Sequence, residues 1–327
     1  MRLLITGGAG FIGSRIARSL AARPDHDILI CDRLRHVANG KWRNLLGVPL
    51  ADVLEPESLL AWLEQNGRGL DAIVHMGAIS STEETDVDAL IAQNFRLSRQ
   101  IWDWCVSRQK LLIYASSAAV YGDGKLGFGD DNHPHAPSLL RPLNPYGWSK
   151  QLFDAYALAA QARGEAPPFW AGLRFFNVYG PFEAHKAGQA SVALHLLRRI
   201  EAGENLRLFR SHKEGIADGA QARDFVWVED CVSVVEWLLD QRVQAGLLNV
   251  GTGQARTFRD LAMAVCAATG KDVPIDWVDT PPALRPTYQY HTQADISRLR
   301  LLGFDRAFTS LEAGLAAYSL ALAAENS

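Results

Sequence analysis

The first half of the chain alternates short apolar runs with longer segments in which apolar residues recur at helical spacing. Such alternation predicts a series of strands and helices. The predicted strands cover residues 3–6, 28–31, 72–75, 111–115 and 171–176, and the predicted helices cover residues 11–22, 59–65, 90–107 and 152–163. Because these strands are almost continuously apolar, we expect both faces of the sheet to be buried. The pattern therefore predicts an α/β fold with a doubly wound parallel sheet.

The second half, after residue 176, has a different pattern, with longer polar stretches between its elements. The predicted elements are helices at 192–202, 230–240, 258–269 and 311–325, a strand at 247–250, and loops at 180–188, 210–222 and 281–292. We expect residues 177–222 and 254–327 to form a smaller α/β substrate-binding lobe. Residues 1–176, joined by about 223–253, would form the larger domain, and a substrate cleft would lie between the two.

Composition narrows the functional classes. The 327 residues are 48% hydrophobic and 21% charged, with a formal net charge of −3, as in an ordinary globular protein without nucleic-acid or membrane partners. The four cysteines form no C-x-x-C pair, so we expect reduced thiols and no metal site. The N-terminal sequence lacks a signal-peptide cleavage region, and no apolar run reaches about 18 residues. We therefore expect a cytoplasmic protein.

A glycine-rich turn follows the first predicted strand and opens the first predicted helix. Gly7 lets the chain turn tightly, Gly10 lets the backbone approach a pyrophosphate, and Gly13 lets the helix pack against the sheet. The N-terminal amides of the helix can then bind the anion. The spacing and its position after a strand predict a Rossmann-type dinucleotide-binding site.

An acidic residue, Asp32, ends the second predicted strand, where it suits a ribose hydroxyl of the dinucleotide. Arg33, Arg35 and Lys41 follow closely, and cations at this place can bind a 2′-phosphate. They can also be merely solvated. We predict NADP as the cofactor, with NAD as the alternative.

Tyr146 and Lys150 stand four residues apart, which places them on one face of a helix. A nearby ammonium group favours the phenolate, so Tyr146 can exchange protons near neutral pH. Taken alone, such a pair is commonly found on a protein surface. Ser117 lies upstream, after an apolar strand, and can hydrogen-bond a reacting oxygen or simply cap the strand end.

Together, these three motifs resemble those of the extended short-chain dehydrogenase/reductase family, and the likeness runs from Met1 to the C-terminal helix. Further segments are similar to one branch of that family, the ADP-glycero-manno-heptose 6-epimerases. These segments are residues 75–82, 142–147, 175–181, 185–186, 223–226, 249–253, 288–289, 292–295 and 299–300. The resemblance implies inversion of C6″ of the heptose by transient oxidation and re-reduction with bound NADP, in the synthesis of a lipopolysaccharide inner-core precursor.

The resemblance also implies which residues act. Ser117, Tyr146 and Lys150 would form the catalytic set, and Lys186 would supply a second acid/base group, although by itself it is an ordinary loop lysine. The implied cofactor-binding residues are Gly7, Gly10, Phe11, Ile12, Gly13, Asp32, Arg33, Lys41, Met76, Gly77, Ala78, Ser80, Asn94, Lys150 and Val178. The implied substrate-binding residues are Ser81, Thr82, Asn177, Gly188, His195, Phe209, Arg210, Arg223 and Tyr288. Arg174 follows a strand pattern and is interpreted as structural.

Two alanines disfavour one related reaction. Dehydratases of the family carry an acid–base pair directly after the serine, whereas this chain has Ala118 and Ala119, which cannot transfer protons. A UDP-hexose 4-epimerase remains an alternative and would not need Lys186. A non-catalytic NADP sensor is a further alternative, but such proteins typically lose the Tyr-x-x-x-Lys pair.

Some positions depart from the pattern of the branch. Gly188 stands where a serine is frequent, and Pro286-Thr287 replaces a Gly-Arg pair whose role Arg285 could take. The segment 213–221 is longer than usual. These departures affect the identity of the sugar and nucleotide more than the reaction type. The resemblance also implies a homo-oligomer, with a pentamer as one form.

Overall fold

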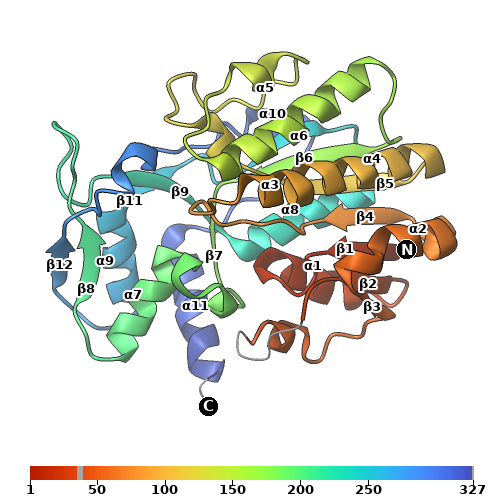
Figure 1. The fold of residues 1–327 in the computed structure, drawn as a ribbon. Helices are drawn as coiled ribbons and strands as arrows, with labels where there is room; N and C mark the ends of the chain where they lie inside the picture. Colours follow the sequence, from red (N-terminus) through yellow and green to blue (C-terminus); the bar gives the residue numbers. More distant parts are fainter. Residues whose placement is uncertain (35–39, 326–327) are drawn as a thin grey trace.

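The computed structural model describes residues 1–34 and 40–325, so Arg35 lies outside the described residues. A seven-stranded sheet forms its centre (Figure 1), with the strand order β10-β6-β5-β4-β1-β2-β3 and every neighbouring pair parallel. Its strands are β1 (Arg2–Thr6), β2 (Asp27–Cys31), β3 (Asp52–Leu54), β4 (Ala72–His75), β5 (Leu111–Ser117), β6 (Trp170–Phe175) and β10 (Gly246–Val250). The order reverses between β1 and β4, the point at which doubly wound sheets bind ligands. The predicted fold class is confirmed.

Helices cover both faces of this sheet, because successive strand residues point to opposite sides. On β1, Leu3 and Ile5 join the core beneath α1 and α8, whereas Leu4 joins the core on the other face. The helices of the first face are α1 (Phe11–Ala21) and α8 (Val228–Gln241), and those of the second are α2 (Leu59–Asn66), α4 (Leu97–Arg108) and α6 (Pro145–Ala162). Both faces are fully buried, which explains the continuous apolar runs.

A third core holds together the smaller part of the molecule (Figure 1). Leu194, Leu208, Leu261 and Leu315 are central to it, and each is at most 5% exposed. Its elements are β7 (Asn177–Tyr179), α7 (Val192–Glu201), β8 (Leu206–Phe209), β9 (Ala222–Trp227), β11 (Ala255–Thr257), α9 (Phe258–Thr269), β12 (Ile275–Val278) and α11 (Leu311–Glu325). The strands form a three-stranded sheet, β11-β9-β7, and a two-stranded sheet, β12-β8.

The remaining short elements connect these layers. They are η2 (Lys41–Leu45), η3 (Pro56–Ser58), η4 (Gly67–Gly69), α3 (Val87–Leu90), η5 (Ile91–Arg96), η6 (Ala118–Tyr121), α5 (Ala136–Leu139), η7 (Ala184–Gln189), η8 (Arg285–Thr287) and α10 (Ser297–Leu301). Within the described ranges, no helix has both the length and the apolar character needed to cross a membrane.

Several predicted boundaries differ from the structure. The helix expected at 152–163 begins at Pro145, because Asn144 caps it by accepting the amide of Gly147 at 2.8 Å. The helix expected at 90–107 is interrupted by the π-helical turn η5. The loop expected at 210–222 ends where β9 begins, at Ala222. Most strands of the smaller sheets were missed because three or four residues are too few to establish a period.

Candidate active site

The glycine turn between β1 and α1 is shaped by close backbone contacts. Gly7 has a φ of +66°, and a Cβ atom at Gly13 would lie 2.2 Å from the carbonyl oxygen of Gly7. Gly10 occupies the N-cap position of α1, where no side chain caps the helix. The first amides of α1 are therefore available to an anion. These features fit the pyrophosphate of a dinucleotide.

Asp32, at the end of β2, lies beside this turn. One carboxylate oxygen accepts the amide of Ala9 at 2.9 Å, and the other accepts the ammonium of Lys41 at 2.5 Å. Arg33 pairs with Glu57 at 3.1 Å. A pocket beside the glycine turn is lined by Asp32, Arg33 and Lys41, so two cations flank the place expected for the ribose.

A cavity of about 510 Å³ opens at the C-terminal ends of the central strands. It brings together the four predicted catalytic residues, Ser117, Tyr146, Lys150 and Lys186, from segments far apart in the sequence. Predicted cofactor and substrate residues that also line it are Gly7, Gly10, Phe11, Ile12, Gly13, Asp32, Lys41, Met76, Gly77, Ala78, Ser80, Thr82, Asn177 and Val178. One cavity therefore adjoins both the dinucleotide turn and all the proposed proton-transfer groups.

Tyr146 and Lys150 lie in the first two turns of α6. The Lys150 ammonium donates to the carbonyl of Ala115 at 2.8 Å, and burial lowers its pKa to about 8. Burial raises the pKa of Tyr146, while a hydrogen bond with the Ser117 side chain acts in the opposite direction. The sequence predicted that a nearby ammonium group would lower the pKa of Tyr146. In this structure the pKa is raised instead, because burial removes water from the phenolate and so disfavours it.

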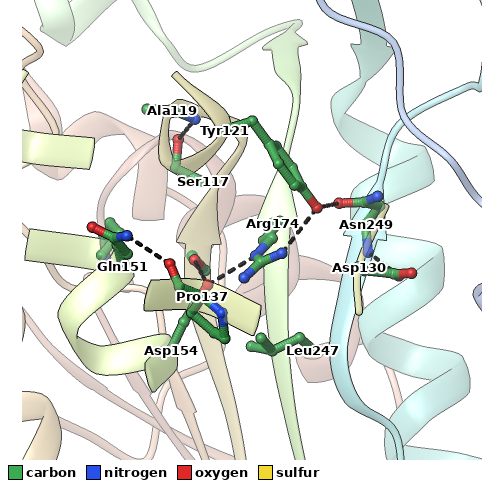
Figure 2. Close-up of polar contacts among 12 residues, drawn as sticks. Ser117, Ala119, Tyr121, Asp130, Pro137, Gln151, Asp154, Arg174, Leu247 and Asn249 are labelled. Atoms are coloured by element: carbon green, nitrogen blue, oxygen red, sulfur yellow. Dashed lines mark hydrogen bonds and ion pairs between the residues drawn. The ribbon is translucent and has the colours of Figure 1, made fainter. Parts of the chain in front are cut away.

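A buried polar network lies behind these residues (Figure 2). Asp154, one turn beyond Lys150, accepts the Arg174 guanidinium at 2.8 Å. Arg174 also donates to the hydroxyl of Tyr121 at 3.0 Å, and that hydroxyl donates to Asn249 at 2.7 Å. Tyr121 is the last residue of η6, the turn that follows Ser117, and Asp154 lies on α6, the helix that carries Tyr146. The Arg174 guanidinium therefore links η6 to α6. Arg174 is thus structural, as predicted, but it supports the site.

Lys186 approaches the cavity from the other side, on the 3-10 turn η7. Its ammonium lies 5.6 Å from the centre of the Phe11 ring, next to the glycine turn. Burial lowers the pKa of Lys186, and the nearby carboxylate of Glu183 partly counteracts that effect. A lysine with a lowered pKa exchanges protons more readily near neutral pH.

Some predicted site residues lie outside the cavity lining. Asn94 is buried behind it, where its side chain holds both backbone groups of Ile79 at 2.9 Å. Arg223 donates to the carbonyls of Ala222 and Gln289, and its guanidinium stacks over Tyr288 at 5.3 Å. The other predicted residues outside the lining are Arg33, Ser81, Gly188, His195, Phe209, Arg210 and Tyr288.

Sequence reasoning missed residues that support the site without lining the cavity. Glu183 and Asp154 are completely buried carboxylates. Asp154 could have been noticed because it follows Lys150 at helical spacing on a buried face. Glu183 gave no such signal, since it lies in an irregular segment.

Three further residues, His185, Gln189 and Phe258, do line the cavity, and the sequence had not predicted that they bind a ligand.

Known proteins resemble this chain over nearly its whole length. Residues 3–251 match the model of the NAD dependent epimerase/dehydratase family. The ADP-L-glycero-D-manno-heptose-6-epimerase of Fusobacterium nucleatum is 40% identical over 324 residues, which cover 97% of this chain and 96% of the relative. The crystal structure of the enzyme of the same name from Helicobacter pylori superposes with a TM-score of 0.80 at 28% identity, over 99% of this chain and 96% of that one.

A second solved structure carries a cofactor. The Thermus thermophilus UDP-glucose 4-epimerase, in complex with NAD, has a TM-score of 0.76 and 27% identity, over 98% of each chain. The likeness thus extends over both the sheet and the smaller part of the molecule. With a family model covering most of its length and relatives at this identity, the chain belongs to the NAD dependent epimerase/dehydratase family.

Proposed function

We propose that this protein is an epimerase that inverts C6″ of ADP-glycero-manno-heptose during synthesis of the lipopolysaccharide inner core. The observation that carries the proposal is the single cavity lined by the glycine turn, Tyr146 and Lys186. The near-full-length relatives of that name support it.

The carbon to be inverted bears a hydroxyl and no acidic proton, so simple deprotonation cannot invert it. A bound nicotinamide supplies reversible hydride transfer, which turns this secondary carbinol into a ketone and back. Tyr146 would remove the proton of the C6″ hydroxyl, with Ser117 hydrogen-bonding the same oxygen. Lys150 would keep a positive charge near the phenol and would bind the nicotinamide ribose.

The carbonyl has to turn over before it is reduced, so its oxygen needs a proton donor in each orientation. Tyr146 serves one orientation, and Lys186, which lines the same cavity, would serve the other. Ala118 and Ala119 offer no acid–base pair for dehydration. The alternative, a C4 inversion of a UDP-hexose, would leave Lys186 without a role.

Residues around the sugar would divide between the two parts of the chain. Thr82 and Asn177 line the cavity and would contact the sugar. Arg223 and Tyr288 would bind the diphosphate once their mutual contact opens. We propose that residues 1–176 and about 223–253, apart from strand β9, hold the cofactor, whereas 177–222 and 254–327 hold the nucleotide sugar. Strand β9 belongs with the second group, because Phe225 and Trp227 pack in the core of the smaller part. A homo-oligomer, with a pentamer as one form, belongs to the same proposal.

Incubation with defined sugar nucleotides tests the function. ADP-D-glycero-D-manno-heptose should convert to a mixture of its C6″ epimers, followed by NMR, without deuterium from D₂O entering C6″, because the hydride returns from the cofactor. Conversion of a UDP-hexose but not of the ADP-heptose would overturn the proposal.

NADP is the cofactor that we propose, supported by Lys41 and Arg33, which line the same pocket as Asp32. Fluorescence titration should show tighter binding of NADP⁺ than NAD⁺, and Lys41→Met should reduce that difference. Lys125→Met, which changes an exposed lysine paired with Asp123, is the control. Tighter binding of NAD⁺ by the unmodified protein would reverse the assignment.

A further inference from the structure

Glu183 is a completely buried carboxylate three residues before Lys186. Four neutral donors surround it. Its Oε2 accepts the Ser191 amide at 2.5 Å, and its Oε1 accepts the Ser191 hydroxyl at 2.6 Å, the Tyr318 hydroxyl at 3.0 Å and the Gly180 amide at 3.3 Å. A buried charge is costly unless it is hydrogen-bonded in this way, so these contacts fix the carboxylate firmly.

The donors come from three parts of the chain. Gly180 begins the segment that carries Lys186, Ser191 is the N-cap of α7, and Tyr318 belongs to the C-terminal helix α11. Figure 1 shows α7 and α11 together in the smaller part of the molecule. Glu183 therefore joins the beginning and end of the lysine segment to α7 and α11, two helices of the smaller part of the molecule.

The other side of the same segment is attached to the cofactor domain. The Phe182 ring lies under the guanidinium groups of Arg15 and Arg18, at 5.0 and 5.3 Å. The Asn44 amide donates to the carbonyls of both Phe182 and Ala9, at 3.1 and 3.0 Å. Adjacent residues, Phe182 and Glu183, thus attach the lysine segment to opposite sides of the cleft.

We propose that Glu183 is a positioning residue for Lys186, and that Tyr318 couples the C-terminal helix to the second acid/base group through it. This inference rests on the proposed role of Lys186 in proton transfer. The backbone between Glu183 and Lys186 forms a single turn, in which the Lys186 amide donates to the Glu183 carbonyl at 2.9 Å. The hydrogen bonds to Glu183 consequently fix the position of the Lys186 backbone, from which the lysine side chain extends.

Tyr318→Phe is the mild test, because it removes one hydroxyl donor and leaves the ring in place. We expect kcat to fall roughly tenfold, the effect of one charge-assisted hydrogen bond, while KM and NADP⁺ affinity stay unchanged. Tyr156→Phe is the matched control, since it removes a tyrosine–carboxylate hydrogen bond to Asp103 on the surface. Full kcat in Tyr318→Phe would overturn the coupling to α11.

A double-mutant cycle separates positioning from general stability. Glu183→Gln should lower kcat by about 10²-fold in the unmodified enzyme but have little further effect in a Lys186→Met background, because both act through the same group. Multiplying effects would show that Glu183 does not act through Lys186. If Glu183→Gln does not fold, the kcat of Tyr318→Phe decides whether the proposal stands.

A substrate-free measurement keeps this inference distinct from the function. Reductive methylation read by peptide mass spectrometry should modify Lys186 roughly tenfold faster in Tyr318→Phe, with Lys125 as the internal reference. This result holds even if ADP-heptose proves not to be the substrate. An unchanged Lys186 rate would contradict the coupling of Tyr318 to Lys186 through Glu183, whereas failure of the unmodified enzyme to convert ADP-heptose would contradict only the function.

Discussion

Arg174 on β6 and Asp154 on α6, the helix that carries Tyr146 and Lys150, form a fully buried ion pair with a distance of 2.8 Å. The side chain of Arg174 is 2% exposed and that of Asp154 is 0% exposed. Asp154 also accepts the hydroxyls of Tyr114 and Ser116, each at 3.0 Å. The pair therefore joins α6 to β5 and β6, the strands that end at the cavity.

Breaking this pair on one side should destabilise the protein strongly. Asp154→Asn or Arg174→Met leaves the other charge buried without its partner, and we expect either to cost about 3–5 kcal/mol of unfolding free energy in urea. The double variant should cost less than the sum of the two single losses, because it removes both charges. Additive losses would show that the two groups do not depend on each other.

The same network affects the charge of Lys150. Burial lowers the pKa of Lys150 to about 8, and the Asp154 carboxylate partly opposes this shift. The ammonium form of Lys150 therefore predominates below pH 8 and is lost as the pH rises through that value. A pH titration of the Lys150 side-chain NMR signal, assigned with Lys150→Arg, should give a midpoint near 8.

Asp154→Asn should shift that midpoint to lower pH, because it removes the charge that favours the ammonium. The alkaline limb of kcat should move in the same direction, since the proposed role of Lys150 needs the cation. Movement to higher pH would contradict the sign of the interaction. Lys110, a half-buried lysine that donates to the Arg68 carbonyl, provides a reference signal.

The glycine turn allows a third test. Gly13→Ala would place a Cβ atom 2.2 Å from the Gly7 carbonyl oxygen, so α1 would have to move away from the turn. We expect loss of nicotinamide-dinucleotide binding together with a lower melting temperature. Gly47→Ser is the control, because a Cβ there meets no atom within 4 Å, although its φ of +71° carries some strain. Normal cofactor binding by Gly13→Ala would show that the turn tolerates the shift.

Sequence patterns predicted the central sheet well and the cleft less well, for a physical reason. Strands such as β4 are buried on both faces, so their apolar runs are unambiguous. The glycine spacing and the Tyr146–Lys150 pair follow from local backbone geometry. By contrast, the anchoring of Lys186 depends on Glu183 meeting Tyr318, 135 residues later. No local pattern predicts that contact, and the short strands of the smaller sheets are equally dependent on tertiary packing.

The two acid/base groups can be separated by substituting each alone. Tyr146→Phe should fold and bind the nicotinamide dinucleotide normally, yet lose about 10²–10⁴-fold in epimerisation, the usual contribution of a general acid–base group. Lys186→Met should cause a loss in the same range, because a complete inversion requires a proton donor in both orientations of the carbonyl. An unchanged rate in either variant would remove that residue from the mechanism.

A sharper distinction comes from single-turnover oxidation of each C6″ epimer separately, followed by the near-ultraviolet absorbance of reduced nicotinamide. If Tyr146 and Lys186 serve opposite orientations, each variant should still oxidise one epimer, and the two variants should retain opposite epimers. The unmodified enzyme should oxidise both. If both substitutions abolished oxidation of the same epimer, the two residues would act on one face of the sugar, and a two-base inversion in this cavity would be wrong.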